Sequence, residues 1–421
     1  GTVFLKGQEV SFPNILANQF ALAGGGAFTQ PLVADDVGVA VAQEVSDQIK
    51  TIAFDVANIS AARNVGVSAA GGEVVAFIDD DAVPDPLWLE NLVQPFADPT
   101  VASAGGFVRG RNGIEYQWKA LLCDGLGDDH ALTIDEAKPF TVIQPHNGLF
   151  AKLQGTNCAF RKTVLVETGG FDEGYRFFLD ETDVCIQLAQ AGHSAAFVPN
   201  AQVHHGFEES ESRTANRVPR TLSYIGASKA RFLEKHSAGM VTDHSVTLFL
   251  ADQRARLIRL MIEGKCEPRD VPRLMRTLKE GFESPQNPAS KPLKLVAREF
   301  QKFGQKPTRK SIGVAGSSLS HKKLMDCAKN HAALGHATLV IRFSITSFFH
   351  RRAFDGRGFW VQTGGLFGKS KRTDTIMKVW TIKSRAVREF RRTASVFPVS
   401  EIHIIKMFRN FVLLMTKSES S

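Results

Sequence analysis

Three consecutive aspartates, Asp79, Asp80 and Asp81, are the residues of this sequence whose types and spacing most directly indicate chemistry. They follow the apolar run "GEVVAFI", which is typical of a buried strand. Like charges this close repel one another and raise each other's pKa unless a cation lies among them. A D-x-D pair at a strand end offers the oxygen ligands that Mg²⁺ or Mn²⁺ prefers while it also holds a phosphate. A solvated turn of Asp and Pro residues is the alternative interpretation.

A second candidate group precedes the aspartates, in the predicted small-residue helix "NISAARNVGVSAAG", which carries Arg63 and Asn64. The planar fork of an arginine donates bidentate hydrogen bonds that suit a diphosphate. An ordinary amphipathic helix with an exposed arginine fits the same pattern.

A third group lies in "FFLDETD", where Asp180 and Glu181 follow an aromatic, apolar run. Partial desolvation would raise the pKa of such a carboxyl group and make it a better general base. Asp183 stands in the first turn of the same predicted helix, where an acid is also favoured by the helix dipole. His204 and His205 follow the next predicted strand, "SAAFVPNAQV". A single histidine is usually structural, but a pair at a strand end can complete a metal or phosphate site.

The elements that must position these groups alternate between strands and helices from residue 29 to residue 207, which indicates an α/β fold with a mostly parallel sheet. Ligands of such sheets bind beyond the carboxyl ends of the strands. The predicted strands are "QPLVADD", "IKTIAFD", "GEVVAFIDDD", "ASAGGFVRG" and "SAAFVPN", and the predicted helices are "ISAARNVGVSAAG", "PLWLENLVQPF" and "ETDVCIQLAQAG".

The rest of the 421-residue chain predicts further units. We expect residues 1–207 to form the first domain, 208–300 a helical extension, and 301–421 a small basic α/β domain. The segment 401–415, "EIHIIKMFRNFVLLM", has apolar residues at helical spacing, and we expect an amphipathic helix there that docks on a neighbour or a membrane surface. The chain does not start with methionine, which leaves an upstream segment open.

Charge and cysteine content narrow the class of protein. The net charge is +8, and residues 341–400 hold thirteen Lys or Arg against three acids. Such a cluster can meet phosphate, an anionic membrane or nucleic acid, or can be a solvated face. The five scattered cysteines show neither the paired spacing of a zinc site nor a disulfide framework, which favours reduced thiols in the cytosol. No apolar run is long enough to span a membrane.

Five motifs in order resemble the family 2 glycosyltransferases of the GT-A fold, over residues 31–205. The motifs are "NISAARNVG", "GEVVAFIDDDAVPDPLWLENLV", "LQGTNCAFRKTVLVETGGFDEGY", "LDETDVCIQLAQAGH" and "VPNAQVHH". The resemblance implies an inverting transfer from a UDP- or GDP-linked sugar, with Mn²⁺ or Mg²⁺ as cofactor. It also implies a glycan, polysaccharide or lipid-linked acceptor and a cytoplasmic enzyme, on the inner face of the membrane if it is peripheral; no nucleic acid is expected.

For the donor, Asp79 and Asp81 match the family's D-x-D motif, and the resemblance implies that Asp81 is the direct metal ligand. Asp79 and Asp80 are expected to contact the nucleotide sugar, and Asp79 is also a candidate metal ligand. Asp35, or equally Asp36, falls near the acid that contacts the nucleoside. Arg63 and Asn64 match the Arg-Asn helix near the diphosphate.

For the acceptor side, Gly155, Thr156 and Asn157 match the segment that lines the sugar and acceptor pocket. Asp180 and Glu181 take the place of the family's Glu-Asp pair, whose second member is the usual base. The order is reversed here, so either residue can be the base.

Two departures support a rival hypothesis. The family's first strand with its Pro-x-Tyr-Asn-like loop is not visible in "GTVFLKGQEVSFPN", and the acid pair reads Asp-Glu (residues 180–181) where the family has Glu-Asp. A third departure is "AGGGAF" (residues 23–28), which stands where a helix-to-strand link is expected and is not a phosphate-binding G-x-G-x-x-G. The alternative is a non-catalytic glycosyltransferase-like scaffold whose basic C-terminal half binds membrane or nucleic acid.

Overall fold

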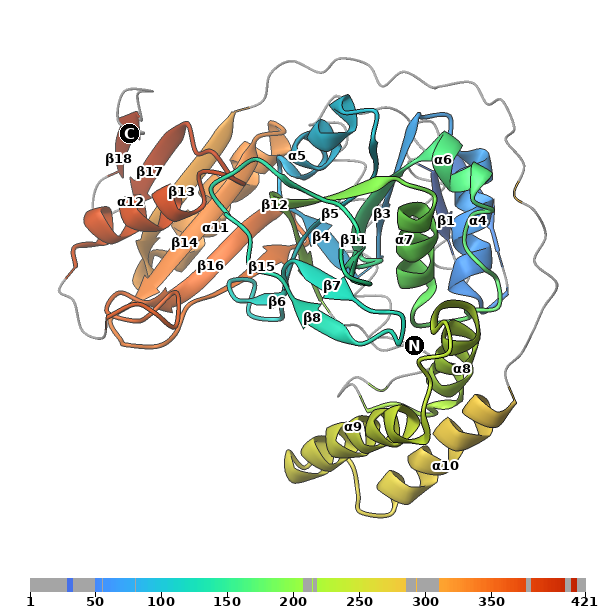
Figure 1. The fold of residues 1–421 in the computed structure, drawn as a ribbon. Helices are drawn as coiled ribbons and strands as arrows, with labels where there is room; N and C mark the ends of the chain where they lie inside the picture. The colour runs from blue at the N-terminus through green and yellow to red at the C-terminus, as the bar shows by residue number, and fades with distance from the viewer. Residues whose placement is uncertain are drawn as a thin grey trace.

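The computed structural model describes residues 29–32, 50–54, 56–79, 81–206, 214, 218–284, 293, 310–375, 380–405 and 410–414 (Figure 1). The predictions for Asp35, Asp36 and Asp80, and for the "AGGGAF" segment, lie outside these residues.

The first domain is built on a mixed sheet in the order β3-β11-β5-β12-β4, with β6 paired to β5 and β9 to β12. Among the described strands of this sheet, β5 and β12 form the one parallel pair, so the expectation of a mostly parallel sheet is wrong. The difference arises because β11 inserts between β3 and β5 and runs antiparallel to both. The strands are β3 (Val74–Ile78), β4 (Ala82–Pro84), β5 (Val101–Arg109), β6 (Tyr116–Trp118), β9 (Thr141–Ile143), β11 (Asn157–Arg161) and β12 (Ser194–His205).

Helices cover both faces of this sheet, which confirms the expected α/β class. On one face lie α4 (Ile59–Ala69), α6 (Lys162–Glu167) and α7 (Asp180–Gln190), whose apolar residues join Phe107 and Phe160 in one core cluster. On the other face α5 (Trp88–Val93) buries Trp88 and Leu92 against the sheet.

Two small sheets accompany the main one. The strands β1 (Thr29–Leu32) and β2 (Lys50–Ala53) pair in parallel, at positions where strands were predicted. The second sheet has the order β10-β7-β8 and was not predicted. It consists of β7 (Leu121–Cys123), β8 (Asp129–Ala131) and β10 (Phe150–Lys152).

The middle of the chain is helical, as expected. It contains α8 (Ser223–His236), α9 (Asp243–Ile262) and α10 (Asp270–Glu283), and α8 and α10 pack closely because Gly226 and Gly281 face the backbone of the partner helix. In Figure 1, α8 lies against the first domain while α9 and α10 extend away from it. Within the described ranges, no helix combines the length and apolar character that a bilayer crossing requires.

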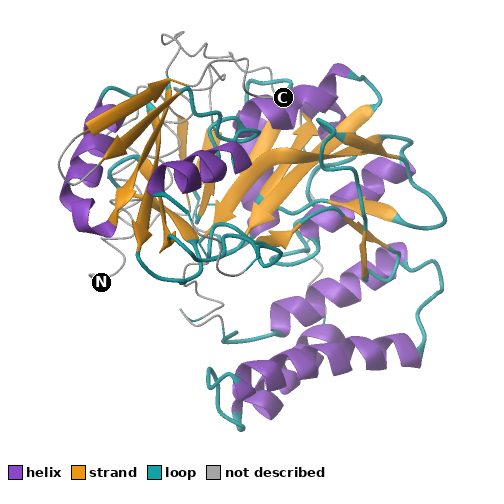
Figure 2. Ribbon diagram, turned by 90° about the vertical axis from the view of Figure 1, so that its left-hand side faces the viewer, coloured by secondary structure: helices purple, strands orange, loops and turns teal. Residues whose placement is uncertain are grey.

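The last part of the chain is a second α/β unit (Figure 2). Its sheet has the order β15-β16-β14-β13-β17-β18, with parallel pairing in the centre and an antiparallel strand at each edge. The helices α11 (His321–Ala333) and α12 (Ile382–Arg392) pack on opposite faces. The strands are β13 (Ser311–Ser317), β14 (Ala337–Ser344), β15 (Arg351–Asp355), β16 (Phe359–Gly365), β17 (Glu401–Ile405) and β18 (Asn410–Leu414).

The expected C-terminal amphipathic helix is wrong, because β17 and β18 form an antiparallel hairpin there. In β17, Ile402 and Ile404 enter the core on the α12 side, while Ile405 enters the core on the α11 side. Isoleucine favours strands, and alternation with Glu401 and His403 matches a period of two. The same short segment also fits a helical period, which is why its sequence misled the prediction.

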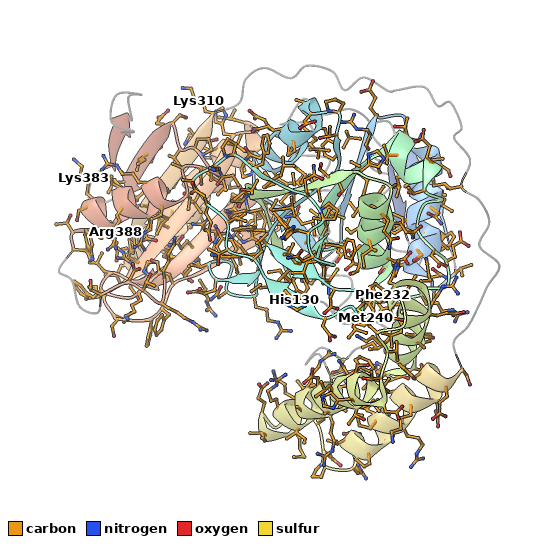
Figure 3. All side chains as sticks on the ribbon, in the orientation of Figure 1. His130, Phe232, Met240, Lys310, Lys383 and Arg388 are labelled. Carbon is orange, nitrogen blue, oxygen red and sulfur yellow. The ribbon has the colours of Figure 1, made fainter. Side chains whose placement is uncertain are left out.

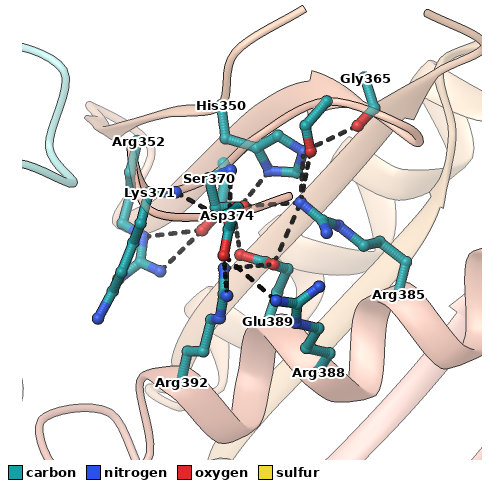
Figure 4. A network of polar contacts seen from close by, with 12 residues as sticks. His350, Arg352, Gly365, Ser370, Lys371, Asp374, Arg385, Arg388, Glu389 and Arg392 are labelled. Carbon is teal, nitrogen blue, oxygen red and sulfur yellow. Dashed lines mark hydrogen bonds and ion pairs between the residues drawn. The ribbon is translucent and has the colours of Figure 1, made fainter. Parts of the chain in front are cut away.

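Several arginines of the basic cluster pair with acids inside this unit (Figure 4). The Asp374 carboxylate accepts hydrogen bonds from Arg388 and Arg392. The bond from Arg392 is the largest of the causes that hold the pKa of Asp374 well below its ordinary value. Buried Arg385 donates to the Ser370 hydroxyl at 2.8 Å and lies 3.4 Å from Glu389. These arginines therefore stabilise the fold itself, in addition to giving the domain its charge.

The two α/β units are in direct contact. The rings of His204 and Trp360 lie 4.2 Å apart, and Arg352 N–H donates to the Asn112 carbonyl at 2.7 Å. A cavity of about 170 Å³ between them is lined by Arg109 and by residues of both units.

Candidate active site

The ends of β3 and β12 bring the carboxylates of the D-x-D motif next to a histidine. Asp79 follows β3 directly, and the β12–β4 ladder pairs His205 with Ala82, one residue beyond Asp81. His205 Nε2 lies 3.1 Å from Asp81 Oδ1. Candidate ligand atoms of Asp79, Asp81 and His205 all lie within 4.8 Å of one another.

The residues of this group fit a divalent cation. His205 Nδ1 lies 3.2 Å from Gln117 Oε1. A neutral imidazole that donates from Nδ1 to Gln117 turns the lone pair of Nε2 toward Asp81, and an outer partner of this kind is usual for metal-binding histidines. Two carboxylates and one imidazole suit Mn²⁺, and the nitrogen ligand disfavours Mg²⁺.

The structure does not bring His204 to this group. Neighbouring residues of a strand point to opposite faces, so His204 turns away from Asp81. Its Nε2 lies 3.2 Å from Asp85 Oδ1, and its ring packs on Trp360. Burial lowers the pKa of His204, although Asp85 pulls it upward. We therefore remove His204 from the predicted metal ligands and assign it to the interface between the two units.

Arg63 lies at the centre of the acidic groups. It projects from α4, is 8% exposed, and forms an ion pair with Asp180. Its guanidinium nitrogens also lie 4.0 Å from Asp79 and 3.8 Å from Glu181. Burial opposes the charge of Arg63, but the three carboxylates outweigh it and raise the pKa above the ordinary value. The positive charge that offsets the repulsion between these carboxylates is thus partly supplied by the protein itself.

The packing around Arg63 fixes its position. Its guanidinium carbon lies 5.3 Å from the centre of the Phe171 ring and 5.8 Å from that of Phe77, within the range of cation–π attraction. On the open side, a Cβ at Gly155 would overlap the guanidinium. Gly155, from the predicted pocket segment, is thus needed for the close approach of Arg63.

The acid pair begins α7, where both residues lie near the helix N-terminus. Burial, followed by the charge of Asp180, raises the pKa of Glu181 to about 8, although Arg63 acts in the opposite direction. Burial likewise raises the pKa of Asp79, again opposed by Arg63. Glu181 therefore titrates near neutral pH, while Asp180 is held by the arginine.

The turn before α7 is strained. Phe178 and Leu179 both have positive φ angles, +79° and +67°, a conformation that costs non-glycine residues about 1–3 kcal/mol each. Contacts from α8 hold this turn, since Ser228 Oγ donates to the Phe177 carbonyl at 2.8 Å. Strain of this kind is concentrated at functional sites.

Sequence reasoning missed that the helical segment supports the site. Asp183, on α7, accepts from Lys235 and from His236 Nε2, both at 2.7 Å. Asp172 accepts from Arg231 and Lys235 of the same helix, α8. The alternation of basic and apolar residues in α8 was the available signal, but it does not show which acids those bases meet.

Two other predicted site residues serve the scaffold. Asn64 donates to the Phe171 carbonyl at 2.8 Å and accepts from the Phe171 N–H at 2.9 Å. Asn157 donates to the carbonyls of Phe107 and Ala201 and accepts from Trp88 Nε1 at 2.7 Å. Thr156, between Gly155 and Asn157, is buried.

Comparison with known proteins identifies the domain that holds this site. The family model described as "Glycosyltransferase like family 2" matches residues 32–222. The chain contains a family 2-like glycosyltransferase domain. This domain includes the carboxylates, Arg63 and the acid pair, and it agrees with the GT-A expectation for the fold.

The glycosyltransferase domain is similar to curated proteins. It is 31% identical over 150 residues to a pre-mycofactocin glycosyltransferase of Mycobacterium tuberculosis. The aligned stretch covers 35% of this chain and 29% of that protein. It is 27% identical over 183 residues to a glucosyl-dolichyl phosphate glucuronosyltransferase of Haloferax volcanii, which covers 41% of this chain and 54% of that protein. The chain thus spans less than a third of the length of the first relative and about half of the length of the second.

One solved structure overlaps the chain in part. It is described as GalNAc-T7 with UDP, GalNAc and Mn²⁺, with a TM-score of 0.35, 17% sequence identity, and coverage of 48% of this chain and 39% of that one.

Proposed function

We propose that the chain is an inverting, metal-dependent glycosyltransferase that moves a sugar from a nucleotide diphosphate to an acceptor hydroxyl. The observation that carries the proposal is the arrangement around Arg63, which sets the Asp79–Asp81–His205 group beside the Asp180–Glu181 pair. One group can hold a cation and a diphosphate, and the other can take a proton.

On the donor side, Asp79, Asp81 and His205 would hold Mn²⁺ together with the diphosphate of a UDP- or GDP-linked sugar. A bound divalent cation supplies Lewis-acid stabilisation of the negative charge that builds on the departing diphosphate. Because Arg63 forms an ion pair with Asp180, its proposed role is to position the acids and to place a positive charge close to the diphosphate.

On the acceptor side, Glu181 would take the proton of the attacking hydroxyl. Its raised pKa gives it a proton affinity suited to that transfer near neutral pH, and general-base catalysis contributes about 10²–10⁴-fold in rate. Attack from the face opposite the diphosphate inverts the anomeric carbon. Asp180 fixes Arg63 and, through its charge, the proton affinity of Glu181.

We extend the same proposal to the acceptor class, which the name of one relative supports, and to the cellular location. One relative is named for transfer onto a dolichyl phosphate-linked sugar. We propose a glycan or lipid-linked acceptor, a role in polysaccharide assembly, and a cytoplasmic location with contact to the inner membrane face.

The test is calorimetric titration of UDP and of GDP, each with and without Mn²⁺, into the full chain and into Asp81→Asn. Glu90→Gln, an exposed acid on α5, is the matched control. We expect one nucleotide to bind only with Mn²⁺, and to lose that binding in Asp81→Asn alone. If the folded protein binds neither nucleotide under any condition, the proposal fails and the scaffold hypothesis replaces it.

A further inference from the structure

A second group of metal-ligand residues lies in the C-terminal unit, far along the chain from the carboxylate group. Candidate ligand atoms of Cys327, His331 and His403 all lie within 4.8 Å of one another. His336 is close by, since its ring centre is 5.8 Å from that of His331. The ring of His403 is 4.9 Å from that of His331.

The fold explains why these residues meet. Cys327 and His331 are four residues apart on α11, and such residues share one face of a helix. In β17, Ile402 and Ile404 face the α12 side, so Glu401 and His403 must face α11. The neighbouring Ile405 confirms this direction, because it packs with Leu324 and Met325 of α11.

The polar atoms of this cluster are poorly satisfied by the protein. His331 Nδ1 and His336 Nδ1 are buried, and neither has a hydrogen-bond partner among the described residues. Buried polar atoms normally do have partners, so each exception requires an explanation.

We propose that Cys327, His331 and His403 form a structural zinc site that joins α11 to β17. A thiolate with two imidazoles is a ligand set that Zn²⁺ favours over the hard cations expected at the carboxylate group. In a tetrahedral zinc site the ligand atoms lie about 3.3–3.8 Å apart. The candidate atoms here lie within 4.8 Å of one another, so shifts of about 1 Å would bring them to the distances of a zinc site.

Glu401 and His336 lie next to the three residues and are the candidates for the fourth zinc ligand. His403 Nε2 lies 2.9 Å from Glu401 Oε1 but has no hydrogen-bond partner among the described residues, so Glu401 is the nearest acid that would either bind the metal or orient His403. Lys310, at the start of this unit (labelled in Figure 3), lies 3.7 Å from Glu401 Oε2. On binding, the Cys327 thiol releases its proton to solvent as the Zn–S bond forms.

The test measures bound metal and ligand type in the full chain. After dialysis against a weak chelator, we expect about one zinc per chain by elemental analysis. Replacement by Co²⁺ should give thiolate-to-cobalt charge-transfer absorption, which the Asp79–Asp81–His205 group cannot produce because it holds no sulfur. Both signals should be lost in Cys327→Ser and His403→Gln, and Glu401→Gln should weaken zinc binding about 10- to 100-fold.

Control variants make the result decisive. Cys266→Ser removes a partly exposed thiol in another part of the fold, and His244→Gln removes an exposed histidine of α9; both should keep zinc and the cobalt band. Asp81→Asn should also keep both signals, so failure of the proposed donor site is distinguishable from failure of this one. Absence of bound zinc and of the cobalt band in the folded wild-type protein, or their survival in Cys327→Ser, would overturn the proposal.

Discussion

The charge state of Glu181 offers the sharpest test of the proposed chemistry. A carboxyl group with a pKa of about 8 is ionised to about 1% at pH 6 and to about one half at pH 8. If Glu181 is the base, kcat/KM at low metal concentration should therefore rise about 50-fold between these pH values. A carboxyl group with an ordinary pKa is already ionised at pH 6 and would give a flat profile.

The protonated form can also be observed without catalysis. Infrared difference spectra of the metal-free protein between pH 6 and pH 10 should show the loss of a protonated carboxyl band. This band should be absent in Glu181→Gln and retained in the control Glu90→Gln, whose side chain is exposed. A bound cation favours the carboxylate, so added Mn²⁺ should move the transition to lower pH.

The same shift has a consequence for stability. The pKa of Glu181 is raised in the folded state, so its protonated form stabilises the protein at low pH. That contribution is lost as the pH rises from about 4.5 to about 8. Glu181→Gln, which cannot ionise, should therefore gain in relative stability above pH 8. A spectrum identical in Glu181→Gln and wild type, together with a flat activity profile, would refute the assignment.

Four further substitutions distinguish residues of the proposed chemistry from residues that support the fold. Asn157→Leu removes three buried hydrogen bonds and should lower the free energy of unfolding by about 3 kcal/mol in urea titrations; an unchanged midpoint would contradict the scaffold role. Gly155→Ala displaces Arg63 from its acids and should lower kcat about 10²-fold, measured by sugar-nucleotide turnover, and should also lower the melting temperature. His205→Leu should weaken Mn²⁺ binding in calorimetry, whereas His204→Leu should leave it intact and lower the melting temperature; equal effects on Mn²⁺ would contradict the geometry.

The sequence predicted the local elements of the site well. The apolar run before Asp79 is a strand, and the helix of Arg63 and the helix that begins at Asp180 lie where their periodicity placed them. These features depend on neighbouring residues, which a single sequence displays directly.

Long-range pairing could not be predicted in the same way. Nothing in "NCAFR" shows that β11 enters the sheet between β3 and β5, because this order depends on contacts with strands far along the chain. For the same reason, Asn157 could be placed near the site but not assigned to the scaffold. The Cys327 cluster was also missed, since its third member is His403 and zinc spacings in sequence cover only nearby ligands.

The last two residues of β12 link two parts of the molecule that the chain order keeps apart. His205 reaches the carboxylate group, and His204, the preceding residue, packs on Trp360 of the C-terminal unit. Because a strand is stiff along its length, a displacement of the C-terminal unit that turns His204 must also move His205. The second unit therefore packs directly against the strand end that carries His205, and it contributes to holding that histidine in place.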